Sequence, residues 1–101
     1  MFVYNISMKV QNVILDEWIA WQKEEHIPEI MATKLFRKYH FYRLLEQDDT
    51  EGTTFIIQYF TDSKENYDSY LLLYAPGLRE KALKKWDDRF IGHRTFMEAV
   101  Q

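Results

Sequence analysis

The sequence contains no cysteine, and this absence excludes disulfides, thiolate nucleophiles and thiolate metal ligands. Glycine and proline are also scarce, with three and two residues among 101, so no flexible linker or low-complexity segment divides the chain. No apolar run approaches the roughly 18 residues of a membrane span, and no basic segment leads into an apolar run as in a secretory signal. We therefore expect one domain over residues 1–101, located in the cytoplasm and not at a membrane.

Aromatic side chains are what the sequence has in excess. They make up 17% of the residues, within an apolar total of 47%, and such rings need large buried surfaces. The formal net charge of −3 is small and negative, which argues against nucleic acid or an anionic membrane as the main partner. The composition is typical of a globular domain with a ring-rich core.

Hydrophobic periodicity predicts four strands. Residues 2–10 alternate strictly between an apolar and a mixed face. Residues 53–61 alternate in the same way, after an acidic turn over 46–52 that ends in glycine. Residues 36–45 and 89–100 carry large side chains at both odd and even positions, so we expect strands with apolar residues on both faces.

The first helix is expected over roughly residues 15–30. Its apolar stripe includes Trp18, but it also contains two polar residues, Gln22 and His26. Pro28 removes a backbone donor, so it should kink or loosen the last turn after His26.

The second helix is expected to begin at Asp62 or Ser63, with Glu65 placed to complete a capping box. The pair at positions 76–77, proline followed by glycine, interrupts this helix, which resumes over residues 78–86.

The resulting element order is βαββαβ. Right-handed crossovers turn this order into a four-stranded antiparallel sheet with two helices on one face, an α+β fold of the ferredoxin-like type. The other face of the sheet is then uncovered, although it carries aromatic and aliphatic side chains. A monomer should not expose such a patch. We therefore predict a homodimer in which the open faces of two sheets pack together.

The same features resemble a known superfamily. The element order, the spacing of Trp18, Trp21, His26 and Pro28, and the strand segment 58–60 are similar to the dimeric α+β barrel proteins. Within that superfamily, residues 3–5, 26–29, 75–76 and 89–90 resemble a family of uncharacterised bacterial domains of this length. The resemblance covers essentially the whole chain and implies the fold and dimerisation, but that family has no established activity.

The wider superfamily includes cofactor-free monooxygenases, haem-degrading enzymes, small isomerases and ligand-binding stress proteins. The resemblance implies a pocket between helices and sheet in each subunit. Relatives commonly place a glycine after the first helix, where this sequence has Thr33 and Lys34.

Four residues are the candidates for such a pocket: Trp18, Gln22, His26 and Tyr70. An imidazole ordinarily titrates near neutral pH, so His26 is the only candidate general base among them, whereas the competing interpretation is that it caps or satisfies a carbonyl near Pro28. Trp18 could stack on a flat ligand or simply fill the core. Tyr70 could bind a polar ligand or pack as an amphipathic core residue.

Metal, haem and RNA are each disfavoured by a missing feature. Residues 63–86 contain no histidine that could ligate haem iron as in haem-degrading relatives, and the group Glu25, His26 and Glu29 lacks a second histidine one turn away. We therefore expect no metal and no cofactor. Residues 2–6 imitate the first-strand motif of RNA-recognition domains, but the third-strand stretch 51–55 is acidic where that motif is basic.

Two functions remain open. The protein is either a non-catalytic binding or assembly module, or a small-molecule-binding protein or cofactor-free oxidase- or isomerase-type enzyme with a pocket between sheet and helices around His26. Cations on the strands, among them Arg37, Arg43 and Arg94, either pair with acids across the dimer or bind an anionic ligand. A concave cavity with convergent polar groups at Gln22 and His26 would favour ligand binding, and solid packing there would favour the module.

Overall fold

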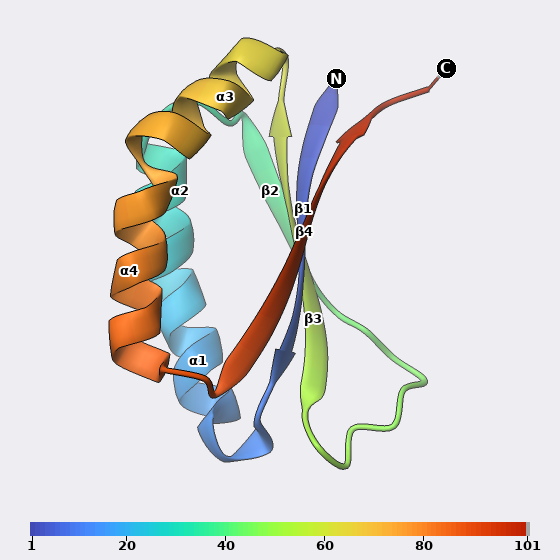
Figure 1. The fold of residues 1–101 in the computed structure, drawn as a ribbon. Coiled ribbons are helices and arrows are strands. Elements are labelled where there is room, and N and C mark those ends of the chain that lie inside the picture. The colour runs from blue at the N-terminus through green and yellow to red at the C-terminus, as the bar shows by residue number, and fades with distance from the viewer. Residues whose placement is uncertain (101) are drawn as a thin grey trace.

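The computed structural model describes residues 1–100 (Figure 1). The elements follow in the order β1 (Phe2–Val10), a 3-10 turn (Asn12–Ile14), α1 (Leu15–Trp21), a π turn (Gln22–His26), α2 (Ile27–Ala32), β2 (Lys38–Arg43), β3 (Thr53–Thr61), α3 (Lys64–Leu73), α4 (Ala75–Trp86) and β4 (Phe90–Glu98). Within these residues, no helix is long and apolar enough to cross a membrane.

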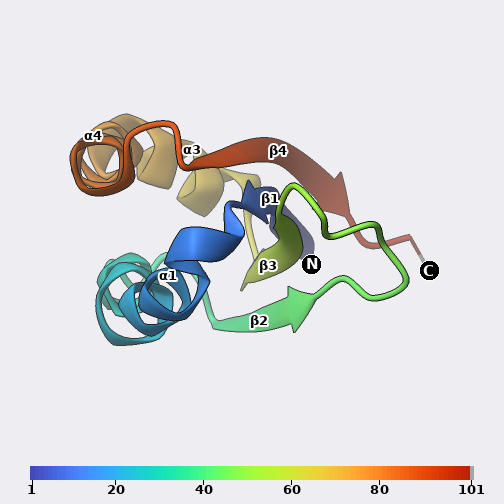
Figure 2. The ribbon, with the colours of Figure 1, turned by 90° about the horizontal axis from the view of Figure 1, so that it is seen from below.

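The four strands form one antiparallel sheet in the order β2-β3-β1-β4. All helices cover the same face of this sheet, and the opposite face is open (Figures 1 and 2). The predicted ferredoxin-like fold is therefore confirmed. The α1–α2 segment crosses from β1 to β2 and the α3–α4 segment crosses from β3 to β4, so the two segments act as the two expected helices.

Strand alternation places the core between the sheet and the helices. Residue Ile6 of β1 lies opposite Ile57 of β3 and Arg94 of β4, and Tyr4 lies opposite Tyr59. The buried apolar residues on the helix-facing side of β1 and β3 are Tyr4, Ile6, Met8, Val10, Phe55, Ile57 and Tyr59. The strict period of two in residues 2–10 and 53–61 thus fixes both strands at their predicted bounds.

The two edge strands are shorter than predicted. Strand β2 spans Lys38–Arg43 instead of 36–45, and β4 spans Phe90–Glu98 instead of 89–100. An edge strand pairs on one side only, so its ends lack a second partner to hold them. Phe36 leaves the sheet and enters the core, where its ring meets Tyr70 at a centroid distance of 5.1 Å.

The first helical segment widens before Pro28, and not after His26 as predicted. A helix would bond the carbonyl of Glu24 to the N–H of residue 28, and proline has no N–H. The backbone instead makes a π turn, in which the N–H of Ile27 donates to the carbonyl of Gln22. Regular α-helix resumes in α2, with Pro28 in its first turn.

At the end of the first helical segment, this sequence has Thr33 and Lys34 where related sequences commonly have a glycine. Lys34 adopts a positive φ of 63°, the left-handed conformation that ends many helices and that glycine adopts at least cost. Its N–H donates to the carbonyl of Met31 at 3.1 Å, and the Thr33 hydroxyl donates to the carbonyl of Ile30 at 2.7 Å. The helix therefore ends in the usual geometry with a lysine in the glycine position.

The second helical segment begins and breaks near the predicted residues. Ser63 is the N-cap, and its hydroxyl accepts a hydrogen bond from the Asn66 N–H at 3.0 Å. The predicted capping box is wrong, because with Ser63 as the cap its partner position is Asn66 and not Glu65. The break falls at Tyr74, and Pro76 lies in the first turn of α4.

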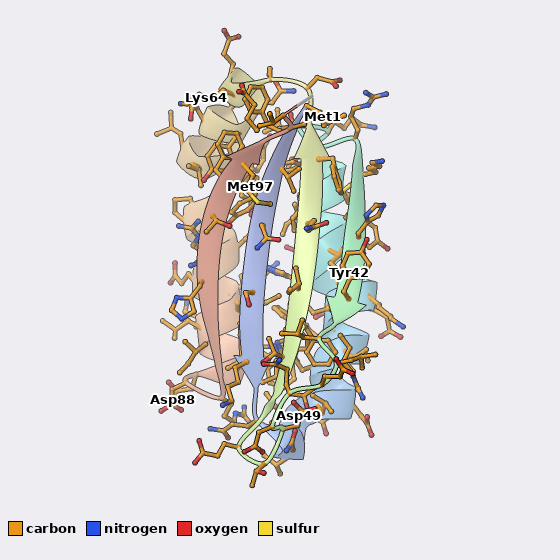
Figure 3. All side chains as sticks on the ribbon, turned by 90° about the vertical axis from the view of Figure 1, so that its right-hand side faces the viewer. Met1, Tyr42, Asp49, Lys64, Asp88 and Met97 are labelled. Carbon is orange, nitrogen blue, oxygen red and sulfur yellow. The ribbon has the colours of Figure 1, made fainter. Side chains whose placement is uncertain are left out.

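The open face of the sheet mixes apolar and polar side chains (Figure 3). Exposed apolar residues include Tyr42, Ile91 and Met97, which are 48%, 63% and 40% exposed. Near the centre of this face, the Gln58 amide donates to the Asn5 side-chain carbonyl at 3.3 Å. Alternation from this pair places Asn5 on the open face and Arg43 and Arg94 on the helix-facing side, while Arg37 lies outside β2 and pairs with Asp62 at 3.0 Å.

Candidate ligand-binding cavity

A cavity of about 200 Å³ lies between the sheet and the helices. Its floor comes from β1, β3 and β4, and its roof comes from the π turn and α4. The lining residues are Ile6, Met8, Gln22, His26, Ile57, Tyr59, Arg79, Ala82, Leu83, Asp87, Phe90, Gly92 and Arg94. The floor is mainly apolar, and the polar groups come from the roof and from the edge strand β4.

Gln22 lies at the start of the π turn and is only 1% exposed. Its amide nitrogen has only the sulfur of Met8 as a partner, at 4.0 Å, and its carbonyl oxygen Oε1 has no hydrogen-bond partner among the described residues. A buried amide without a strong partner costs about 1–3 kcal/mol. At the wall of a cavity such an atom is accessible to a hydrogen-bond donor that enters the cavity, either a ligand or an ordered water.

His26 lies at the other end of the same π turn. Its ring stacks on Trp21 with centroids 4.5 Å apart, and it makes no capping bond at the start of α2. Burial lowers the pKa of His26 from 6.5 to about 4; Glu29 opposes this shift, and Lys81 and Arg94 add to it. The imidazole is therefore neutral at pH 7, with one nitrogen to donate and one to accept.

Two arginines bring positive charge to the cavity. Arg94 is the only charged residue that β4 contributes to the lining, and it lies in register with the buried Ile6. Arg79 comes from α4, and its guanidinium donates to the Tyr4 hydroxyl at 3.2 Å. Neither arginine forms a salt bridge with a carboxylate within residues 1–100.

Two of the four predicted site residues do not line this cavity. Trp18 is 0% exposed and packs among Phe41, Phe55 and Phe90. Tyr70 is 3% exposed, and burial raises its pKa. Both side chains thus lie in the core, whereas Gln22 and His26 meet at the cavity wall.

Sequence reasoning did not single out Arg79 or Gly92 as cavity residues. Arg79 lies on an exposed, charged helix, where nothing in the sequence distinguishes it from neighbouring cations. Gly92 lies opposite Met8, and a Cβ there would contact the Met8 side chain at 3.5 Å, an ordinary distance. Arg94 was among the cations that the sequence suggested for an anionic ligand, and it shares the helix-facing side of β4 with Phe90 and Phe96.

The described residues contain no group of three histidine, aspartate or glutamate side chains placed to hold a metal ion. The available chemistry is therefore hydrogen bonding by a neutral amide and imidazole, attraction of an anion by two guanidinium groups, and contact with an apolar floor.

Solved structures with the same fold include several small α+β proteins. An ethyl tert-butyl ether d (EthD) family protein from Bacillus halodurans superimposes with a TM-score of 0.73 at 14% identity, covering 99% of this chain and 100% of its own. A dimeric ferredoxin-like protein from an uncultured marine organism gives 0.72 at 13%, covering 99% and 95%. A candidate antibiotic biosynthesis monooxygenase from Deinococcus radiodurans gives 0.65 at 18%, covering 100% and 94%. At these identities the likeness establishes a ferredoxin-like fold and nothing about activity.

The sequence itself falls in one family. The chain belongs to the family described as Domain of unknown function (DUF4286), whose sequence pattern matches residues 1–100. No curated protein matches the chain.

Proposed function

We propose that the protein is a homodimer that binds a small molecule in the cavity of each protomer and does not transform it. The observation that carries this proposal is Gln22, a fully buried amide with an unpaired carbonyl at the wall of a cavity. The indole nitrogens of Trp18 and Trp86 are also buried without a partner, but of these three residues only Gln22 lines the cavity. A ligand that donates a hydrogen bond to Oε1 recovers the free energy that the empty site loses.

The state of His26 favours binding over catalysis. A general base works best when its pKa lies near the working pH, and the pKa of His26 lies near 4. At neutral pH this imidazole is a weak base that takes a proton reluctantly. It is suited to orient a ligand by a neutral hydrogen bond, supported by its stack on Trp21.

The homodimer is supported by the open sheet face. Tyr42, Ile91 and Met97 are exposed on this face, and the side chains of Asn5 and Gln58 are hydrogen-bonded to each other near its centre. Apolar side chains with a few paired polar groups are typical of a protein interface. A structural neighbour of the same fold is described as a dimeric ferredoxin-like protein. Burial of one open face against another also hides the apolar patch of both protomers at once.

Light scattering after gel filtration tests the dimer. We expect about 25 kDa, twice the protomer mass of 12.4 kDa. Phe60→Glu introduces a charge on the open face and should give monomers, whereas Leu72→Glu, on the exposed side of α3, should leave the dimer intact. A wild-type protein that stays at the protomer mass at micromolar concentration contradicts the proposed assembly.

Native mass spectrometry of the gently purified protein, with Gly92→Leu as an occluding variant, tests the binding. A leucine at this position extends into the cavity from a strand position of ordinary backbone geometry. We expect a bound small molecule, or ligand-induced thermal stabilisation in a metabolite panel, in wild type and neither in Gly92→Leu. The matched control is Gly77→Ala, because a Cβ at this position meets nothing within 4 Å. Binding that survives in Gly92→Leu would place the site elsewhere.

A further inference from the structure

We infer that the ligand is a small monocarboxylate with an apolar body and a hydrogen-bond donor remote from its carboxylate. This inference rests on the proposed function and adds to it the chemical class of the ligand.

The charges are separated along the cavity. Arg79 lies in α4 and Asp87 directly follows its last residue, so the eight positions between them correspond to about 12 Å along the helix. Arg94 and Phe90 are four positions apart in β4, which corresponds to about 13 Å along a strand. Along β1, Met8 and Ile6 line the cavity, and Tyr4 lies two positions beyond Ile6. Because Arg79 bonds to Tyr4, it lies toward this end of the cavity. One end of the cavity is therefore basic, and the other, near Phe90, carries the single carboxylate.

The basic end is suited to a carboxylate. Guanidinium groups bind carboxylates with two parallel hydrogen bonds, and neither Arg79 nor Arg94 has a carboxylate partner within the described part of the chain. The two arginines and Asp87 together give the lining a formal charge of +1, since His26 is neutral. This positive lining favours an anionic over a cationic ligand, and a ligand with one negative charge balances the net charge of +1.

The remaining lining describes the rest of the ligand. Ile6, Met8, Ile57 and Phe90 offer apolar surface, and the unpaired Oε1 of Gln22 can only accept a hydrogen bond. A volume of about 200 Å³ corresponds to roughly seven water molecules in the liquid, which limits the ligand to about the size of a benzoate ion. A hydroxy-substituted aromatic or short aliphatic carboxylate meets all three conditions.

Isothermal titration with matched probes tests this inference. The probes are 3-hydroxybenzoate, its neutral amide 3-hydroxybenzamide, and 3-methoxybenzoate, which lacks the donor. We expect 3-hydroxybenzoate to bind at least tenfold more tightly than either analogue. The ratio of the affinity for 3-hydroxybenzoate to the affinity for 3-hydroxybenzamide should fall at least tenfold in Arg94→Gln and in Arg79→Gln. This ratio should return in Arg94→Lys and Arg79→Lys. The preference over the methoxy compound should vanish in Gln22→Leu.

The matched control is Lys84→Gln. This substitution also removes one positive charge from α4, but Lys84 pairs with Glu80 at 3.1 Å and does not line the cavity. It should keep the preference for the carboxylate. The inference is overturned if the amide binds as tightly as the carboxylate, if the preference survives both arginine substitutions, or if no probe binds at millimolar concentration. Binding of neutral compounds that Gly92→Leu abolishes would refute the carboxylate and still support the proposed function.

Discussion

The neutral, partly buried His26 should make the protein lose stability on mild acidification. Burial in the folded state lowers the pKa of His26 from 6.5 to about 4, so between these pH values the unfolded chain binds a proton that the folded chain does not. The free energy of unfolding therefore rises with pH in this window, and the contribution is lost as the pH falls from 6.5 toward 4. The surrounding charges enter the same balance, because Glu29 raises this pKa and Lys81 and Arg94 lower it.

The size of the loss follows from the shift. At about 1.4 kcal/mol per pKa unit, the shift of His26 corresponds to about 3 kcal/mol between pH 6.5 and pH 4, and solvent at the partly exposed ring reduces it to about 2 kcal/mol. A domain of this length is stable by about 5–15 kcal/mol, so the loss is readily measurable.

Urea unfolding of wild type and His26→Gln at several pH values provides the assay. The substitution removes the titrating group and keeps a polar side chain, so the stability difference between the two proteins should change by about 2 kcal/mol from pH 7 to pH 4. All other titrating groups are common to both proteins and cancel in this difference. Parallel curves for the two proteins, or a pKa of His26 at 6.5 or above by NMR titration, would refute the argument.

Three further predictions follow from single residues. Gln22→Leu removes the unpaired amide and should raise the stability of the ligand-free protein by about 1 kcal/mol, seen as a higher Tm; a drop in Tm would show that the amide has a partner. Lys34→Gly should raise the free energy of unfolding, measured in urea, by about 1 kcal/mol, because glycine adopts the positive φ of this position without strain. A lower free energy of unfolding would contradict the left-handed conformation of residue 34. Gly52→Ala should lower the free energy of unfolding by about 1–3 kcal/mol, because its Cβ would lie 2.8 Å from the Val10 carbonyl oxygen. The control is Gly77→Ala, whose Cβ meets no neighbour and which should not destabilise the protein. Equal effects of the two substitutions would refute the steric explanation.

Local patterns in the sequence predicted most of the fold. Residues 2–10 and 53–61 alternate strictly, and because each pairs with neighbours on both sides the structure holds them over their full length. The cap at Ser63 and the break near Pro76 follow from the chemistry of single residues. The ends of the edge strands could not be predicted in this way, since Phe36 joins the core only through its contact with Tyr70.

Two of the four residues that the sequence predicted for the candidate site line the cavity. Gln22 and His26 share a helical stripe in the sequence, and both line the cavity. The same stripe could not show that Trp18 is enclosed by three phenylalanines from three strands. Arg79 reaches the cavity through a bond to Tyr4, seventy-five positions away, and such a contact depends on the register of the whole sheet.

A crystal structure of the purified protein, grown at neutral pH without carboxylate buffers, tests most directly whether the protein is a dimer with a ligand in each protomer. We expect two protomers joined through their open sheet faces. We also expect density in each cavity that contacts Gln22 at one point and Arg79 and Arg94 at another. A cavity collapsed onto Gln22, with its amide bonded to another protein group and no room for a ligand, would contradict this expectation.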